Sequence, residues 1–167
     1  MKRPAAETPR LPHLLPVSLL ALLILASDLA TKRVFWGGGA VIDVIPPFFT
    51  IVPRENTGGV FGLMAHQAAS NLLFVAVSVG AIGFLGWLYT TSAARLGLAF
   101  ALAIGLILGG AAGNLVDRVS YGFVRDFLEF SIGRFTWPTF NLADSAICVG
   151  TAVLAWRLWK VPPPEAA

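Results

Sequence analysis

Charged residues are scarce in this sequence. Only 13% of its 167 residues are Asp, Glu, Lys or Arg, whereas 56% are hydrophobic. Soluble domains carry about 25% charged residues, so the composition excludes an ordinary water-soluble globular domain. The net charge of +3 is small and no run of Lys or Arg exceeds two residues. No nucleic-acid partner is therefore expected.

Cysteine and histidine are scarcer still. The single cysteine, Cys148, excludes an internal disulfide and any metal site built from several cysteines. The two histidines, His13 and His66, are too few for a histidine-rich zinc site. The motifs H-E-x-x-H, G-x-S-x-G and G-x-x-x-x-G-K are also absent, which excludes the usual zinc peptidase, serine hydrolase and nucleotide-binding signatures.

Long apolar runs are abundant instead. A membrane-spanning helix needs about 20 predominantly apolar residues, and uncharged stretches of that length or more occur between the few charged positions. The sequence predicts an all-α membrane protein, a single domain with four transmembrane helices at about residues 14–30, 71–89, 96–113 and 140–159.

The segment from Val41 to Val52 is apolar but too short to cross a membrane. Pro46 and Pro47 would break a helix there, and its β-branched and aromatic residues favour short strands. We expect a small extracytoplasmic β element between the first two spans. The tails, 1–10 and 161–167, are predicted to be disordered.

A cleaved signal peptide is the alternative for the first apolar run, because Lys2, Arg3 and Arg10 precede it. Three further spans follow, and Asp28 and Lys32 at its end have the character of site residues. These features favour a permanent first span.

Four spans bring the polar residues to one membrane face, because the first and third helices end where the second and fourth begin. Every acidic residue except Glu7 and Glu165 falls on that face. Lys and Arg divide equally between the two faces, so the total does not set the orientation. The N-terminal basic cluster favours a cytoplasmic N-terminus, which places both termini in the cytoplasm and the acidic face outside it.

Ionisable residues in or beside a span are candidates for a functional site. Asp28 and Lys32 are spaced i,i+4 and could simply form an ion pair, and Asn114, Asp117 and Arg118 could form a helix-capping network. Asp126 and Asp144 are harder to explain structurally, because a lone carboxylate one turn into an apolar helix is strongly disfavoured. Two carboxyl groups that share one proton provide a general base and a general acid for hydrolysis.

The third span carries small residues four apart, at Ala101, Gly105, Gly109 and Gly113. This spacing places them on one helix face, where another helix backbone could approach closely. The alternative is that these glycines are common filler in a membrane helix.

Three motifs indicate the protein family: Gly109 to Arg118 (GGAAGNLVDR), Gly122 to Phe127 (GFVRDF) and Phe140 to Asp144 (FNLAD). They resemble the lipoprotein signal peptidase (signal peptidase II) family, whose pattern is G-G-A-x-G-N-x-x-D-R, G-x-V-x-D-F and F-N-x-A-D. Two shorter elements match in family order, at 28–32 (DLATK) and 56–58 (NTG). The chain departs from the family at Gly59-Val60-Phe61, where Ala-Ala-Phe is frequent.

The resemblance implies an aspartic endopeptidase of the bacterial cytoplasmic (inner) membrane. Such enzymes cut prolipoproteins just before a diacylglyceryl-modified cysteine. The catalytic pair would be Asp126 and Asp144. The supporting or substrate-positioning residues would be Asp28, Lys32, Asn56, Gly58, Asn114, Asp117, Arg118 and Asn141. The resemblance implies no metal or organic cofactor. We expect membrane lipid as a partner and a monomeric protein.

Two other classes of membrane protein are alternatives to a peptidase. A small proton-coupled transporter also uses membrane carboxylates, but the spans are apolar toward the terminal side and no inverted repeat is visible. An inactive membrane scaffold on the same fold is the other alternative, and the presence of both Asp126 and Asp144 argues against it.

Overall fold

The computed structural model describes residues 13–58 and 67–160 and shows four helices long and apolar enough to cross a membrane. The spans are Leu14–Trp36, Ala69–Ala93, Leu96–Tyr121 and Leu142–Trp159. The predicted four-span membrane fold is confirmed. The predicted disordered tails and the Gly59-Val60-Phe61 departure lie outside the described residues.

The first span consists of α1 (Leu14–Thr31) and a short π-helix, η1 (Lys32–Trp36). The second and third spans form one continuous assignment, α2 (Gln67–Tyr121), which is broken at Gly97. Gly97 has φ 78° and ψ −172°, a conformation that glycine adopts without a Cβ penalty. The Nη2 of Arg157 donates to the Leu96 carbonyl over 2.7 Å beside this break. The fourth span, α3 (Leu142–Trp159), is thereby tied to the hairpin of the second and third.

The third span is the centre of the bundle. Of its most apolar 18 residues, 61% are buried within the protein, against 11–17% in the other three spans. Its small residues explain this position. A Cβ on Gly109 would lie 2.6 Å from the Ala21 carbonyl oxygen of α1, and one on Gly110 would lie 2.5 Å from the Ala143 carbonyl oxygen of α3. The close helix approach predicted from the glycine spacing is present at Gly109, against α1, and Gly110, outside that spacing, makes a second close approach to α3.

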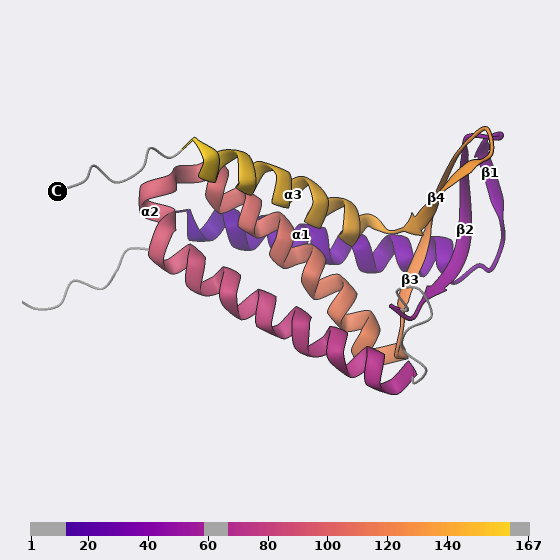
Figure 1. Ribbon diagram of the computed structural model, residues 1–167, viewed down its shortest axis with the longest axis horizontal. Coiled ribbons are helices and arrows are strands. Elements are labelled where there is room, and N and C mark those ends of the chain that lie inside the picture. Colours follow the sequence, from indigo (N-terminus) through magenta and orange to yellow (C-terminus); the bar gives the residue numbers. More distant parts are fainter. Residues whose placement is uncertain (1–12, 59–66, 161–167) are drawn as a thin grey trace, which may run out of the picture.

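A four-stranded antiparallel sheet lies beyond one end of the helices (Figure 1). Its order is β1 (Ile42–Ile45), β2 (Phe49–Asn56), β3 (Val124–Ile132) and β4 (Phe135–Phe140). The sequence predicted strands only between the first two spans. The other half of the sheet comes from the segment between the third and fourth spans, so the predicted fourth span begins too early: Phe140 ends β4 and α3 starts at Leu142.

The sheet brings the two inter-span segments together. Strands β2 and β3 pair with Arg54 opposite Asp126 and Asn56 opposite Val124. Residues about seventy positions apart in the sequence thus pair at the end of the helical bundle that carries the sheet. The start of α1 and the end of α3 lie at the opposite end of the bundle (Figure 1).

Candidate active site

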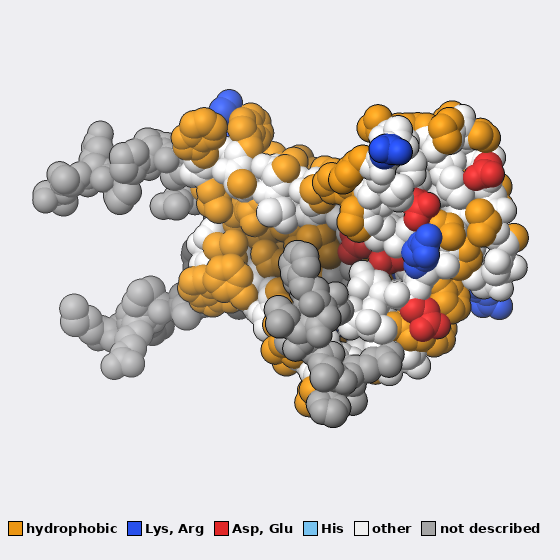
Figure 2. Space-filling model, turned by 45° about the vertical axis from the view of Figure 1, so that its right-hand side comes forward, with side chains coloured by type: hydrophobic (Ala, Val, Ile, Leu, Met, Phe, Trp, Pro, Cys, Tyr) orange, Lys and Arg blue, Asp and Glu red, His pale blue; other side chains and the backbone are white. Residues whose placement is uncertain are grey.

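Asp126 and Asp144 meet where the sheet joins the helices. Asp126 lies on β3 and its side chain is buried, with 1% exposure. Asp144 lies in the first turn of α3. Figure 2 shows acidic side chains in and beside a hollow at this junction, with a basic side chain next to them and a mainly hydrophobic helical surface beyond.

Asn141 links the two carboxyl groups. It is the N-cap of α3: its Oδ1 accepts the Asp144 backbone N–H over 2.9 Å, and its own backbone N–H donates to Asp144 Oδ2 over 3.2 Å. This reciprocal arrangement is a capping box. The Nδ2 of Asn141 donates to Asp126 Oδ1 over 2.8 Å. One residue therefore holds both members of the pair.

Two more asparagines complete the donor set. Asn56 Nδ2 donates to Asp126 Oδ2 over 2.9 Å, and Asn114 Nδ2 donates to Asp144 Oδ1 over 2.7 Å. Each of the four carboxyl oxygens therefore accepts one N–H. The remaining lone pairs of Asp126 and Asp144 are left for water, a substrate or a shared proton.

The orientation of each amide is set by a group that only donates. The Oδ1 of Asn56 accepts from the Gly58 N–H over 2.9 Å, and the Oδ1 of Asn114 accepts from Lys32 Nζ over 3.0 Å. The Oδ1 of Asn141 accepts from a backbone N–H, as described above. Neither an ammonium nor a backbone N–H accepts a hydrogen bond, so every NH2 group is directed at a carboxyl oxygen.

A buried ionic network lies beneath the pair. Lys32, fully buried, contacts Asp28 at 2.7 Å and Asp117 at 3.1 Å. Arg125 donates to Asp117 through Nε over 3.0 Å and Nη2 over 2.7 Å. Asp28 Oδ1 also accepts the Ala143 N–H over 2.9 Å. Two cations and two carboxylates balance, which removes the penalty of an uncompensated buried charge.

The predicted Asp28–Lys32 ion pair is therefore real but is part of a larger network. Asn114, Asp117 and Arg118 do not form a capping network among themselves. Asn114 donates a hydrogen bond to Asp144, and Asp117 forms ion pairs with Lys32 and Arg125. The Arg118 guanidinium lies 4.4 Å from the centre of the Phe74 ring.

Burial raises the pKa of Asp126 from 3.8 to about 6. The negative charge of Asp144 acts in the same direction, whereas the N–H donors of Asn56 and Asn141 and the charge of Lys32 act in the other. Asp126 therefore binds a proton more readily than an ordinary aspartate does.

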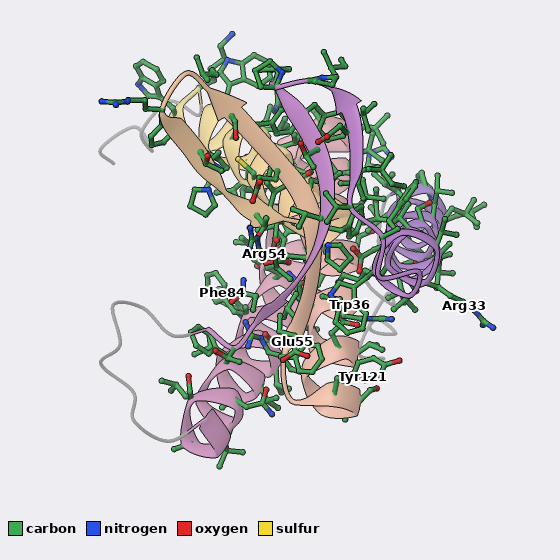
Figure 3. All side chains as sticks on the ribbon, turned by 90° about the vertical axis from the view of Figure 1, so that its right-hand side faces the viewer. Arg33, Trp36, Arg54, Glu55, Phe84 and Tyr121 are labelled. Atoms are coloured by element: carbon green, nitrogen blue, oxygen red, sulfur yellow. The ribbon has the colours of Figure 1, made fainter. Side chains whose placement is uncertain are left out.

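A polar cavity of about 290 Å³ opens beside Asp126. It is lined by Arg54, Glu55, Asn56, Thr57, Asp126, Pro138 and Thr139. Figure 3 shows Arg54 and Glu55 on the end of the molecule that carries the sheet, with Trp36 and Tyr121 near Glu55. An apolar pocket on the sheet, lined by Phe48, Phe130 and other hydrophobic residues, contains no acidic or basic side chain.

All ten residues singled out in the sequence are placed at this end of the helices, and three contributors were missed. Arg125 lies within the GFVRDF motif but was given no role there, although it pairs with Asp117. Asn71 and Phe74 were not considered, because the second span reads as a plain apolar helix. Their i,i+3 spacing beside the predicted helix start was the available signal. Within the described residues, no group of three or more His, Cys, Asp or Glu side chains is arranged to hold a metal ion.

Comparison with known proteins identifies the group to which this site belongs. The family model described as signal peptidase (SPase) II matches residues 20–160. The chain belongs to the signal peptidase II family. The lipoprotein signal peptidase of Syntrophotalea carbinolica is 38% identical over 145 residues, which cover 85% of this chain and 89% of the relative. That of Pelotomaculum thermopropionicum is 41% identical over 144 residues, covering 84% and 89%.

Two solved structures of bacterial membrane enzymes share this fold. A bacterial membrane enzyme determined by the in meso method at 1.9 Å resolution is 28% identical, with a TM-score of 0.78 over 88% of this chain and 94% of that one. A second such enzyme, at 2.3 Å resolution, is 27% identical, with a TM-score of 0.76 over 91% and 94%. The helical bundle with its appended sheet is therefore a known arrangement among membrane enzymes.

Proposed function

We propose that this chain is an aspartic endopeptidase that removes signal peptides from prolipoproteins, cutting before a diacylglyceryl-modified cysteine. Membership of the signal peptidase II family and the names of its relatives support the substrate class. The observation that carries the aspartic mechanism is the bridging of Asp126 and Asp144 by Asn141.

The two carboxyl groups divide the acid and base roles. Asp126, with its raised pKa, holds the proton, and Asp144 is the general base. Asp144 lies in the first turn of α3, where Asn114 Nδ2 and the Asn141 backbone N–H donate to its two carboxyl oxygens. Paired carboxyl groups in different environments provide this division of labour in other hydrolases.

Hydrolysis then needs no covalent intermediate. The oxygen of a water molecule bonds to the scissile carbonyl carbon while one of its protons passes to Asp144. The proton of Asp126 passes to the carbonyl oxygen, which gives a tetrahedral diol. When the C–N bond breaks, the leaving nitrogen takes the proton from Asp144 and one diol hydroxyl returns a proton to Asp126. The products are a carboxylic acid and an amine, and the pair regains its single proton.

The remaining residues act as supports in this proposal. Asn56, Asn114, Asn141 and Gly58 orient the pair, whereas Asp28, Lys32, Asp117 and Arg118 fix the helices around it. The site lies at the extracytoplasmic face of the bacterial inner membrane, with both termini in the cytoplasm. The enzyme acts as a monomer on substrates anchored in the lipid, and needs neither metal nor organic cofactor.

A cleavage assay tests the proposal directly. Three purified proteins in detergent, the wild type, Asp126→Asn and Asp144→Asn, are each incubated with a diacylglyceryl-modified precursor. The wild type should release the signal peptide, and each variant should lose turnover while its thermal unfolding stays cooperative. Because the two residues act as a unit, the double variant should be little slower than either single one. Near-normal turnover by either single variant would refute the assignment, and an inactive wild type would favour a scaffold.

A further inference from the structure

Phe74 is a half-buried residue of the second span that belongs to none of the family motifs. Its ring makes two contacts with the site. On one side lies the Arg118 guanidinium, 4.4 Å from the ring centre. On another lies Gly58, where an added Cβ would overlap the Phe74 ring. Gly58 also has φ +75°, so the position requires glycine for both its conformation and this close approach.

The Gly58 contact leads to a catalytic carboxyl group in two hydrogen bonds. The Gly58 N–H donates to Asn56 Oδ1 over 2.9 Å, and Asn56 Nδ2 donates to Asp126 Oδ2 over 2.9 Å. If the Gly58 N–H moves, nothing in this turn fixes which end of the Asn56 amide faces Asp126. The position of the Phe74 ring therefore controls the donor on Asp126.

The Arg118 contact compensates for an incomplete set of hydrogen bonds. Arg118 is 9% exposed, and its Nη1 is buried with no hydrogen-bond partner among the residues that the structure describes. An aromatic face attracts a desolvated guanidinium, so the Phe74 ring holds it. One turn earlier on the same helix, Asn71 Nδ2 donates to the Arg118 carbonyl over 3.1 Å. The second span thus contacts Arg118 through two side chains on one helix face, Asn71 and Phe74.

We propose that Phe74 is a positioning residue for the peptidase reaction, which holds Gly58 and Arg118 and through Gly58 fixes the Asn56 amide on Asp126. The role rests on the proposed function. The effect of Phe74 on turnover passes through Asn56.

The test compares Phe74→Leu with Phe84→Leu. Both positions lie on the second span, and the substitution is identical. Phe84 is 57% exposed and projects from the outer side of the helices (Figure 3). Leucine keeps an apolar side chain but loses the flat ring. We expect kcat for the lipid-modified precursor to fall about ten-fold to a hundred-fold in Phe74→Leu, since a misplacement of about 1 Å has effects of this size. KM should stay within about two-fold, and Phe84→Leu should match the wild type.

A double-variant cycle separates positioning from general weakening of the fold. If Phe74 acts through Asn56, adding Phe74→Leu to Asn56→Ala should slow turnover by less than about three-fold, because residues in one network are not additive. Wild-type kcat in Phe74→Leu, or losses that multiply fully with Asn56→Ala, would overturn the proposal. An inactive wild type and an inactive Phe84→Leu would instead refute the proposed function.

Gly58→Ala perturbs the same contact from the other side and covers the case in which Phe74→Leu does not fold. The added methyl group must displace the turn or the ring, whereas the interior of the bundle is untouched. The same fall in kcat with little change in KM is expected. A fully active Gly58→Ala enzyme would show that the contact does not position Asp126.

Discussion

The ammonium of Lys32 lies 3.0 Å from the amide oxygen of Asn114, at a point in the bundle where Lys32 has no exposure to solvent. The same ammonium forms ion pairs with the carboxylates of Asp28 and Asp117, at 2.7 and 3.1 Å. This contact orients the Asn114 amide toward Asp144. A cation of the buried network thereby determines which end of the Asn114 amide faces Asp144.

Replacing Lys32 by Met should abolish turnover and lower the melting temperature. Removing one partner from a buried ion network costs about 3–5 kcal/mol, because Asp28 would stay buried without a cation and Asp117 would keep only Arg125. Arg33→Met is the matched control: the neighbouring side chain is exposed and points away from the bundle (Figure 3). Thermal unfolding and the cleavage assay measure both effects. A stable, active Lys32→Met variant would contradict the role given to the network.

The burial of Asp126 predicts a pH-dependent stability. Its pKa is 3.8 ordinarily and about 6 in the folded protein, so the folded state binds more protons between these values. Stability from this group is complete below about pH 4 and is lost as pH rises through 6. Two pKa units correspond to about 3 kcal/mol.

The Asp126→Asn variant lacks this titration. Its melting temperature should therefore rise relative to that of the wild type between pH 4 and pH 7, and the difference should be constant above pH 7. Thermal unfolding of both proteins in one detergent across this range gives the comparison. A difference that does not change with pH would show that Asp126 titrates normally.

Features that depend on residues close together in the sequence could be predicted from it, whereas features that depend on distant residues could not. The four spans follow from local composition, and the Asp28–Lys32 pair follows from helical spacing. No strand was predicted at β3, whose nine residues include Arg125, Asp126 and Glu129 and so do not form an apolar run. Its partner, β2, lies about seventy residues earlier, and such a non-local pairing leaves no local pattern.

The site shows the same limit. The motifs supplied both carboxyl groups and all three asparagines, but not their directions, because amide orientation depends on donors from other elements. Phe74 resembles any lipid-facing aromatic residue of a span in sequence. Its role depends on Gly58 and Arg118, which approach it from the first inter-span segment and from the third span.

Gly109 and Gly80 provide a test of helix packing with one substitution. A Cβ on Gly109 would lie 2.6 Å from the Ala21 carbonyl oxygen and 2.8 Å from Ile24 Cβ, whereas one on Gly80 would meet nothing within 4 Å. Gly109→Ala should destabilise the protein by about 1–3 kcal/mol, since overpacking forces backbone shifts. Gly80→Ala should be neutral or slightly stabilising, because alanine favours helix. Equal melting temperatures for the two variants would mean that α1 does not pack closely on the third span.

The basic N-terminus predicts the topology. Lys2, Arg3 and Arg10 precede the first span, which favours a cytoplasmic N-terminus, and four spans return the chain to the same side. A reporter that works only in the cytoplasm should be active when fused after Trp159, and one that works only outside should be inactive. The reverse result would place the site on the cytoplasmic face.

The position of Asp144 predicts that the substrate's lipid places the scissile bond. Asp144 lies in the first turn of the fourth span, so the bond must be presented at the membrane boundary. Peptide groups without water there cost several kcal/mol each when unsatisfied. A diacylglyceryl group left in the bilayer holds its cysteine at one depth, with each buried CH2 contributing about 0.8 kcal/mol. We therefore expect the lipid to set the depth of the scissile bond as well as to anchor the substrate.

A precursor with an unmodified cysteine should therefore be cut at least about a hundred-fold more slowly, because its bond is not held opposite Asp126 and Asp144. The two precursors are compared in the same liposomes, with the density of inserted substrate measured directly, so that a difference in membrane binding does not enter the rates. The unmodified precursor retains its signal-peptide helix and serves as the matched control for anchoring. Equal rates at equal density would show that the helix alone places the bond, since only the loss of positioning distinguishes the two substrates once both are in the membrane.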